Sequence, residues 1–278
     1  MFQGRKLIIA TQHQKEKIIA PLIEDAIGVN CIKNTLFNTD TLGTFSGEVE
    51  RKNDVITTLR SKCINAMTMH NVDLAIASEG SFGQHPSLFF IPGNEESLLF
   101  LDLKNNIEIV ARELSTETNF SGQYVNNKFE LKEFCKQVKF PSHAIILKSD
   151  QTNWSVIYKG INNHSKLLWL FNKMIDSFGR VYVETDMRAH FNPTRMSVIQ
   201  KASIKLVQKI QSKCPSCQTP GFDIQNVNPG LPCSLCGSAT RSTLSVNYIC
   251  TKCNFMTEEK FPNKKKTEDP MYCDYCNP

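Results

Sequence analysis

The stretch KLIIATQHQKEKIIAPLIEDAI, residues 6–27, decides the fold class of the N-terminal region. Residues 6–10 are a short β-rich run, and residues 15–27 then carry apolar side chains at helical spacing. A similar order follows, because Asn53 or Asp54 can cap a helix that reaches Met69, before an apolar strand at residues 72–77. Strands that alternate with helices predict an α/β domain.

Downstream, strands and helices continue to alternate. Three strand-like runs separated by turns predict an antiparallel meander at residues 87–91, 97–103 and 107–113. Further helices are expected at residues 128–138 and 166–178, and further strands at residues 144–148 and 180–184. Parallel and antiparallel strands together predict a mixed sheet.

The sequence Asn192-Pro193 is a strong helix start, because Asn caps helices well and Pro suits the first helical position. An apolar stripe behind it predicts a helix from Thr194 to about Ser212. Helical periodicity ends there, and the content of Cys, Pro and Gly rises. We therefore expect an α/β domain over residues 1–212 and a small cysteine-rich module, similar to a zinc ribbon, over residues 213–278.

Composition limits the class of protein. Of the 278 residues, 41% are hydrophobic, which is enough for a core, and the net charge of +5 permits an anionic ligand without requiring one. No apolar run reaches the roughly 18 to 20 residues that span a bilayer, so no membrane partner is expected. The short apolar run after Lys6 does not make a signal peptide. Three single cysteines, expected in the core, favour a cytoplasmic chain over a disulfide-bonded one: Cys31, Cys63 and Cys135.

The C-terminal region contains four CxxC pairs. They are Cys214/Cys217, Cys233/Cys236, Cys250/Cys253 and Cys273/Cys276. A two-residue spacing lets a tight turn aim both thiolates at one ion, and two such turns complete a tetrahedron. Eight thiolates therefore predict two structural zinc ions, with iron the second choice and disulfides or redox pairs the alternative. Neither the nested arrangement, first pair with last, nor the sequential one, first with second, is excluded.

Metal is expected to be part of the folding of this region. A module of this size with few large aliphatic side chains cannot readily fold by apolar burial alone, whereas a structural zinc contributes on the order of 10 kcal/mol or more. Four protein ligands leave no open coordination position, so catalysis by these ions is not expected.

Polar residues gather where the predicted strands of the N-terminal half end. They occupy residues 11–17, 40–51 and 79–86, with glycines at 43, 47, 80 and 83. Ligands of open α/β sheets bind at the carboxyl ends of strands, and glycine allows close approach of the backbone. Ordinary polar turns are the alternative interpretation.

Residues 5–85 resemble the inosine/xanthosine triphosphate pyrophosphatase superfamily. The order of four short motifs carries the resemblance: Ala10, Thr11 and Lys17; Ser46, Gly47, Glu48 and Arg51; Arg60, Asn65 and Ala66; Asp73, Glu79 and Gly80. The resemblance implies that Lys17 and Arg60 contact a triphosphate, and that Glu48 and Glu79 hold Mg²⁺ or act as a base. The full set of expected substrate-binding residues is Thr11, Lys17, Arg51, Arg60, Ser81, Arg188 and Arg195, of which the last two come from the helix start near Asn192 and not from this resemblance.

The whole chain also resembles a bacterial family of unknown function that shares the segments ASEGSFG and ETDMRAHFNPTR and the CxxC pairs. The second segment brings acids, His190 and Arg188 to the start of a helix whose first turn holds Arg195, where an anion such as phosphate can bind. A salt-bridged loop that fixes the helix is the alternative.

Two functions follow as hypotheses. The first is a Mg²⁺-dependent hydrolase of nucleotides or other phosphate esters, with a structural zinc module. The second is a nucleic-acid or protein binding module of the zinc-ribbon type on a non-catalytic scaffold. The basic residues of the zinc module are offset by nearby acids, which favours the hydrolase. Sequence leaves the oligomeric state open.

Overall fold

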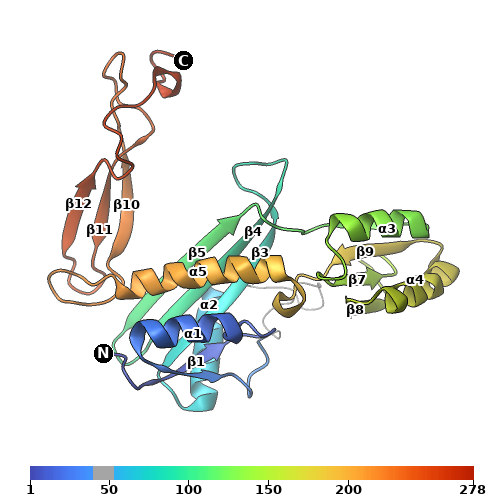
Figure 1. Ribbon diagram of the computed structural model, residues 1–278. Coiled ribbons are helices and arrows are strands. Elements are labelled where there is room, and N and C mark those ends of the chain that lie inside the picture. The colour runs from blue at the N-terminus through green and yellow to red at the C-terminus, as the bar shows by residue number, and fades with distance from the viewer. Residues whose placement is uncertain (40–52) are drawn as a thin grey trace. The chain divides into compact units, whose positions relative to one another are not determined.

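The computed structural model describes residues 1–39 and 53–278 (Figure 1). Contacts divide the chain into two compact units, Met1–Val207 (unit 1) and Gln208–Pro278 (unit 2). The chain is mixed α/β with a mixed sheet and a C-terminal set of cysteine pairs. Within the described residues, no helix has the length and apolarity to cross a membrane.

The first sheet of unit 1 has the strand order β2-β1-β3-β4-β5. Its strands are β1 (Lys6–Ala10), β2 (Asn30–Lys33), β3 (Leu74–Gln84), β4 (Pro92–Asp102) and β5 (Ile107–Ser115). β1 runs parallel to β2 and β3, whereas β4 and β5 complete the sheet as antiparallel strands. The sheet is therefore mixed, as predicted.

Helices α1 (Glu16–Ile27) and α2 (Val55–His70) connect the parallel strands. Asp54 caps α2 by accepting from the amides of Ile56 and Thr57, which confirms the predicted start of this helix. Alternate residues of β3 point to opposite faces, so Ala75 and Ala77 pack on α2 while the intervening side chains face the other way.

The second sheet of unit 1 is antiparallel, with the order β6-β9-β7-β8. Its strands are β6 (Gly122–Val125), β7 (Ile145–Lys148), β8 (Ile157–Ile161) and β9 (Val181–Thr185). Helices α3 (Lys128–Gln137) and α4 (His164–Phe178) supply Phe134 and Phe171 to the core that this sheet builds. The predicted helices at 128–138 and 166–178 are thus confirmed.

Helix α5 (Pro193–Gln211) follows β9. The amide of Arg195 donates to Asn192 Oδ1 at 2.9 Å, so Asn192 caps the helix as its sequence predicts. The last residues of α5 lie in unit 2, a few residues before the predicted domain boundary at 212.

Two predictions about β3 and its surroundings are wrong. Residues 87–91 are the connection between β3 and β4, not a strand, and residues 79–84 continue β3 instead of forming a loop. The reason is the hairpin: residues 79–84 pair along their whole length with residues 92–97, so polar Glu, Ser and Gln side chains are carried into a ladder. The short strands β2, β6 and β8 had no sequence signal.

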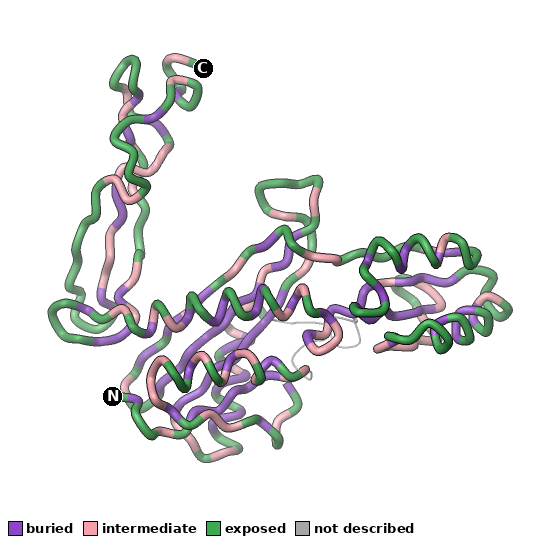
Figure 2. The backbone as a smooth tube through the Cα atoms, viewed as in Figure 1, coloured by how far each residue is buried: buried purple, intermediate pink, exposed green. Residues whose placement is uncertain are grey.

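Unit 2 is built on a three-stranded antiparallel sheet, β10 (Asp223–Pro229), β11 (Thr243–Ile249) and β12 (Met256–Lys260). Figure 2 shows buried residues concentrated along the strands of unit 1, whereas the strands of unit 2 are largely exposed or half-buried. Every residue of β12 is exposed. Apolar burial is therefore a weaker source of stability in unit 2 than in unit 1.

Candidate metal centres and a buried charge cluster

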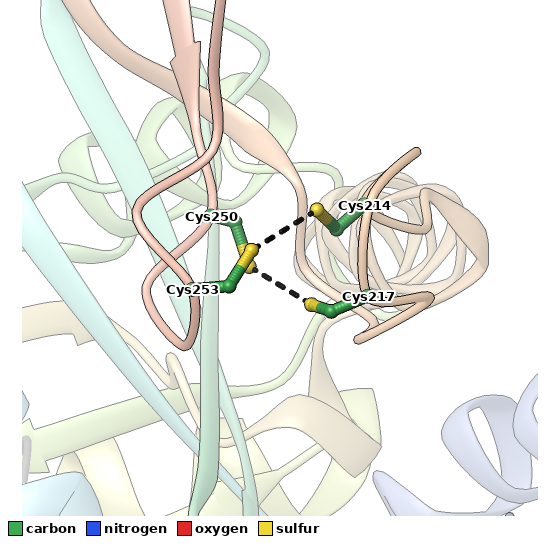
Figure 3. A group of neighbouring side chains, drawn as sticks. All are labelled: Cys214, Cys217, Cys250 and Cys253. Atoms are coloured by element: carbon green, nitrogen blue, oxygen red, sulfur yellow. Dashed lines mark hydrogen bonds between the residues drawn. The ribbon is translucent and has the colours of Figure 1, made fainter.

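Four cysteines meet at one end of the sheet of unit 2 (Figure 3). The Sγ atom of Cys214 lies 3.6 Å from that of Cys253, and the Sγ atom of Cys217 lies 3.6 Å from that of Cys250. We call this group the first cysteine set. Cys214, Cys250 and Phe222 form an apolar cluster there, against which Tyr248 packs.

A second cysteine set has the same arrangement. The Sγ atom of Cys233 lies 3.9 Å from that of Cys276, and the Sγ atom of Cys236 lies 3.7 Å from that of Cys273. In each set the four sulfurs all lie within 4.8 Å of one another.

These distances fit a shared metal ion and exclude disulfides. Two bonded sulfurs lie about 2.0 Å apart, whereas a tetrahedron with Zn–S bonds of about 2.3 Å places its sulfurs about 3.8 Å apart. All eleven cysteines of the chain are described and free of disulfides. The two sets could therefore hold two zinc ions, and four thiolates with no other donor suit zinc among the common metals.

The observed pairing is interleaved, so both pairings considered from the sequence are wrong. The antiparallel sheet is the reason. Asp223 at the start of β10 pairs with Ile249 at the end of β11, which brings the pairs that flank these residues to one end of the sheet. The other two pairs fall outside that end, joined by a bridge between Cys233 and Glu268. Strand pairing, and not loop length, sorts the cysteines.

All four CxxC turns share one backbone hydrogen bond. The amide four residues after the first cysteine donates to the carbonyl of that cysteine, from Gln218, Gly237, Asn254 and Asn277. The first three of these residues have φ of 61°, 75° and 58°, in the left-handed region that Gly and Asn tolerate well. A hydrogen bond with the Thr219 side chain lowers the pKa of Cys217 to about 6, and one with Ser238 does the same for Cys236. Hydrogen bonds with the other thiols of each set, together with burial, instead raise the pKa of Cys253 and of Cys276 to about 12.

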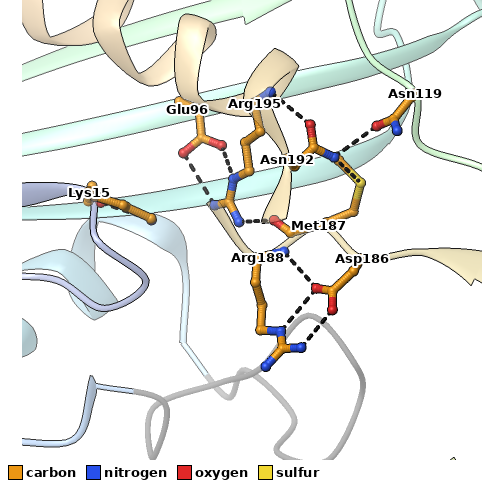
Figure 4. Close-up of polar contacts among 9 residues, drawn as sticks. Lys15, Glu96, Asn119, Asp186, Met187, Arg188, Asn192 and Arg195 are labelled. Carbon is orange, nitrogen blue, oxygen red and sulfur yellow. Dashed lines mark hydrogen bonds and ion pairs between the residues drawn. The ribbon is translucent and has the colours of Figure 1, made fainter. Parts of the chain in front are cut away.

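A second group of ionisable residues lies in unit 1, around the end of β1 and the middle of β3 (Figure 4). Lys15, in the connection from β1 to α1, is only 5% exposed, and its ammonium donates to Ser78 Oγ at 3.0 Å. Burial, followed by the positive charge of Arg195, lowers the pKa of Lys15 to about 7. No carboxylate among the described residues forms an ion pair with this ammonium.

Two buried ion pairs accompany Lys15. Arg195 Nε donates to Glu96 Oε1 at 2.6 Å, and both side chains are fully buried. Gly80 makes room for this pair, because a Cβ there would lie 2.6 Å from Glu96 Oε1 and closer still to Arg195. The other pair joins Lys62 of α2 to Glu79 of β3.

Lys15 links these two ion pairs electrostatically, since the charges of Arg195, Glu96, Glu79 and Lys62 each affect its pKa. We call Lys15, Lys62, Glu79, Glu96 and Arg195 the buried charge cluster. It holds three cationic and two anionic side chains at neutral pH when Lys15 is protonated. Thr11, on the same connection as Lys15, adds a buried Oγ1 with no hydrogen-bond partner among the described residues.

A cavity of about 300 Å³ opens beside this cluster. Gly80, Ser81 and Phe82 line it from β3. The remaining wall comes from the second sheet and its flanking segments, with Phe120, Ser121, Gly122, Ile146, Tyr182 and residues 184–188. Aromatic rings, carboxylates and a guanidinium therefore face one space.

The chain matches the model of one known protein family. The family model described as "Domain of unknown function (DUF6671)" matches residues 62–278. The chain belongs to this family. No curated protein matches it.

The DUF6671 match begins in α2 and runs through both cysteine sets. It includes Lys62, Glu79, Glu96 and Arg195 but not Lys15. The family description names no activity, so the resemblance of residues 5–85 to the pyrophosphatase superfamily stays a prediction.

The predicted substrate-binding residues of this DUF6671 member fall into separate places. Ser81 and Arg188 line the cavity, where Arg188 pairs with Asp186 at 2.6 Å, and Arg195 and Thr11 are buried close to Lys15. Lys17 is exposed and donates to Gln14. Arg60 pairs with Glu108 of β5 at 2.7 Å, on the surface.

Two predicted residues, Glu48 and Arg51, lie outside the described part of the chain. Three members of the buried charge cluster had not been singled out from the sequence: Lys15, Lys62 and Glu96. A lysine two positions before the predicted one, and a glutamate in the polar first half of β4, were the available signals. The sequence contains these residues but does not show which of their side chains are buried.

Proposed function

We propose that unit 1 is a hydrolase that binds a nucleotide or another phosphate ester through Lys15. The observation that carries the proposal is the buried ammonium of Lys15, which no described carboxylate neutralises. A buried charge without a partner is costly, and proteins retain such groups mainly where a ligand or a reaction uses them. An anionic phosphate would supply the missing charge.

The surroundings of Lys15 support an anion in particular. With Lys15 protonated, the buried charge cluster has one more positive than negative charge, and the unpartnered Thr11 Oγ1 can donate to a phosphate oxygen. Glu79, held by Lys62, is the described carboxylate proposed as the base that activates water.

In this proposal, Mg²⁺ binds to the protein only together with the substrate. Among the described residues, groups of three or more metal-binding side chains occur only in the two cysteine sets. The carboxylates predicted for Mg²⁺ therefore reduce to Glu79, because Glu48 lies outside the described residues. A nucleoside triphosphate carries its own Mg²⁺, which would offset the charge that develops on the leaving pyrophosphate.

A phosphate-release screen tests the proposal. Canonical and deaminated nucleoside triphosphates are incubated with Mg²⁺ and either the wild type, Lys15→Met or Glu79→Gln. We expect turnover of at least one nucleotide and a loss of roughly 100-fold or more in both variants, the size seen when one charge-stabilising donor is removed. Lys17→Met is the matched control, since Lys17 is exposed; it should retain turnover within a few-fold.

The outcome also separates two locations for the phosphate site. Turnover that depends on Lys17 and not on Lys15 would restore the location that the resemblance implies. No turnover on any nucleotide would end the hydrolase proposal and leave the second candidate, a binding function of the zinc module. Exposed apolar side chains beside the second cysteine set favour that candidate.

A further inference from the structure

The two cysteine sets differ in what surrounds them. At the first set, Phe222 stacks on Tyr248 with ring centroids 5.7 Å apart and lies 6.0 Å from Phe255, so aromatic rings pack together beside the sulfurs. At the second set, large apolar or aromatic side chains lie within two residues of the cysteine ligands in the sequence, and these side chains are exposed. Leu235 is 74% exposed, Met271 62%, Tyr272 61% and Tyr275 78%.

The backbone that carries these exposed side chains is fixed by hydrogen bonds and by the cysteine turns. Leu235 lies inside one CxxC turn and Tyr275 inside the other, and the four sulfurs join the two turns. Met271 and Tyr272 belong to a short 3-10 helix that Asp269 caps by accepting from the Met271 amide at 2.8 Å. Ordered aromatic rings lose little conformational entropy on binding, so such a surface is prepared for a ligand.

The charges around this surface leave a positive excess of one, because Lys264 and Lys266 stand against Asp269 once the ion-paired residues are set aside. Asp274 pairs with Arg241 at 3.0 Å, and Glu268 pairs with Lys265 at 2.8 Å, so these acids are already neutralised. Lys264 and Lys266 have no ion-pair partner within residues 1–39 and 53–278. Glu268, the partner of Lys265, forms a backbone bridge with Cys233, so the lysine run lies beside the second cysteine set.

We propose that the second cysteine set presents a binding surface for single-stranded nucleic acid, made of Tyr272, Tyr275, Lys264 and Lys266. Bases stack on the two tyrosine rings, and the two lysines contact phosphates. Flat exposed rings beside cations match the chemistry of a single strand, whose bases are free to stack, better than that of a duplex. This surface is independent of the hydrolase proposed for unit 1.

The test uses the full-length, zinc-loaded protein and fluorescence anisotropy of labelled RNA and DNA strands of about 12 nucleotides, with the matching duplexes. We expect single strands to bind more tightly than duplexes. Tyr272→Ala and Tyr275→Ala should each weaken binding about tenfold, and the double Tyr→Phe variant should stay within about twofold of the wild type because it keeps both rings. Trp169→Ala, at an exposed aromatic residue of unit 1, is the matched control and should not change binding.

Salt dependence gives a second measure. Two lysine contacts predict a slope of about −1.4 for log K against log of salt concentration, and Lys264→Ala/Lys266→Ala should bring that slope close to zero. Zinc content is measured on every variant, because exposed side chains are expected to leave both metal sites filled. At full zinc content, three results would each overturn the proposal: no binding of either strand, binding that the tyrosine variants leave unchanged, or a preference for duplex. Selective binding of a protein partner by this surface without any strand would do the same.

Discussion

Unit 1 and unit 2 are stabilised by different kinds of interaction. Unit 1 buries apolar clusters on both of its sheets and also buries the five ionisable side chains of the buried charge cluster. Unit 2 exposes every residue of β12 and gathers its cysteines into two tetrahedral sets. In unit 1, which has a large apolar core, buried charged side chains mark the candidate site. In unit 2, the buried polar groups instead contribute to the stability of the fold.

Removal of metal should show the largest difference between the units. A chelator that strips zinc at neutral pH should unfold unit 2, because a structural zinc contributes on the order of 10 kcal/mol, and leave unit 1 folded. Hydrogen exchange measured by mass spectrometry would show loss of protection in β10 to β12 and retention in β3 and β4. Equal loss of protection in both units would contradict the comparison, and re-addition of zinc is the control for reversibility.

Replacement of Lys15 should stabilise unit 1. The pKa of Lys15 is about 7 in the folded protein against the usual 10.5, so between these values the unfolded chain binds the extra proton and wild-type stability rises with pH. Below pH 7 the cost of the buried ammonium is fully present, and Lys15→Met should raise the free energy of unfolding by several kcal/mol. Above about pH 10.5 the advantage of the variant should largely vanish.

Urea unfolding of unit 1 at pH 6, 8 and 10 measures this dependence. Lys17→Met serves as control, with a difference from the wild type that stays within about 0.5 kcal/mol at each pH. A Lys15→Met variant that is less stable at pH 6 would mean that the ammonium has a stabilising partner in the folded protein. Added inorganic phosphate should narrow the gap between wild type and variant, since phosphate stabilises only the form that binds it.

Structural features that depend on residues close together in the sequence could be predicted, whereas features that depend on distant residues could not. Asn192 and Asp54 act on amides two or three residues away, so both helix starts were predictable from local rules. The pairing of the cysteines depends on which strand ends meet, and that is set by the register of β10 and β11 across the sheet. Local patterns identify the ligands of a metal site, whereas long-range strand pairing decides how they are shared.

Lys15 and Lys17, which follow β1, show the same limit of prediction within a few residues. His13 and Gln14 have φ of 64° and 61°, and this left-handed turn precedes the residue that points inward. Lys15 is therefore buried and Lys17 exposed, although both are lysines of one short polar segment. The sequence motifs singled out Lys17 and not Lys15, because side-chain direction depends on a turn that no residue preference announces.

A smaller effect is expected at Gly80, within the strong core of unit 1. Gly80→Ala places a Cβ against the buried Arg195–Glu96 pair and should cost about 1–3 kcal/mol by displacing it. Gly83→Ala, on the same strand, adds a Cβ with no heavy atom within 4 Å and should be close to neutral. Thermal unfolding of both variants measures the difference. Equal destabilisation would show that loss of glycine in β3, and not crowding of the ion pair, causes the effect.

The smallest effect is expected at Arg60. Its ion pair with Glu108 lies on the surface, with the arginine side chain 47% exposed, and such pairs contribute less than about 1 kcal/mol. A double-mutant cycle of Arg60→Ala and Glu108→Ala should give a coupling free energy of about 0.2–1 kcal/mol that falls with added salt. If unit 1 hydrolyses a nucleotide at Lys15, turnover by Arg60→Ala should equal that of the wild type. A large loss of turnover with unchanged stability would instead mean that Arg60 leaves Glu108 to reach the phosphates, as the pyrophosphatase resemblance implies.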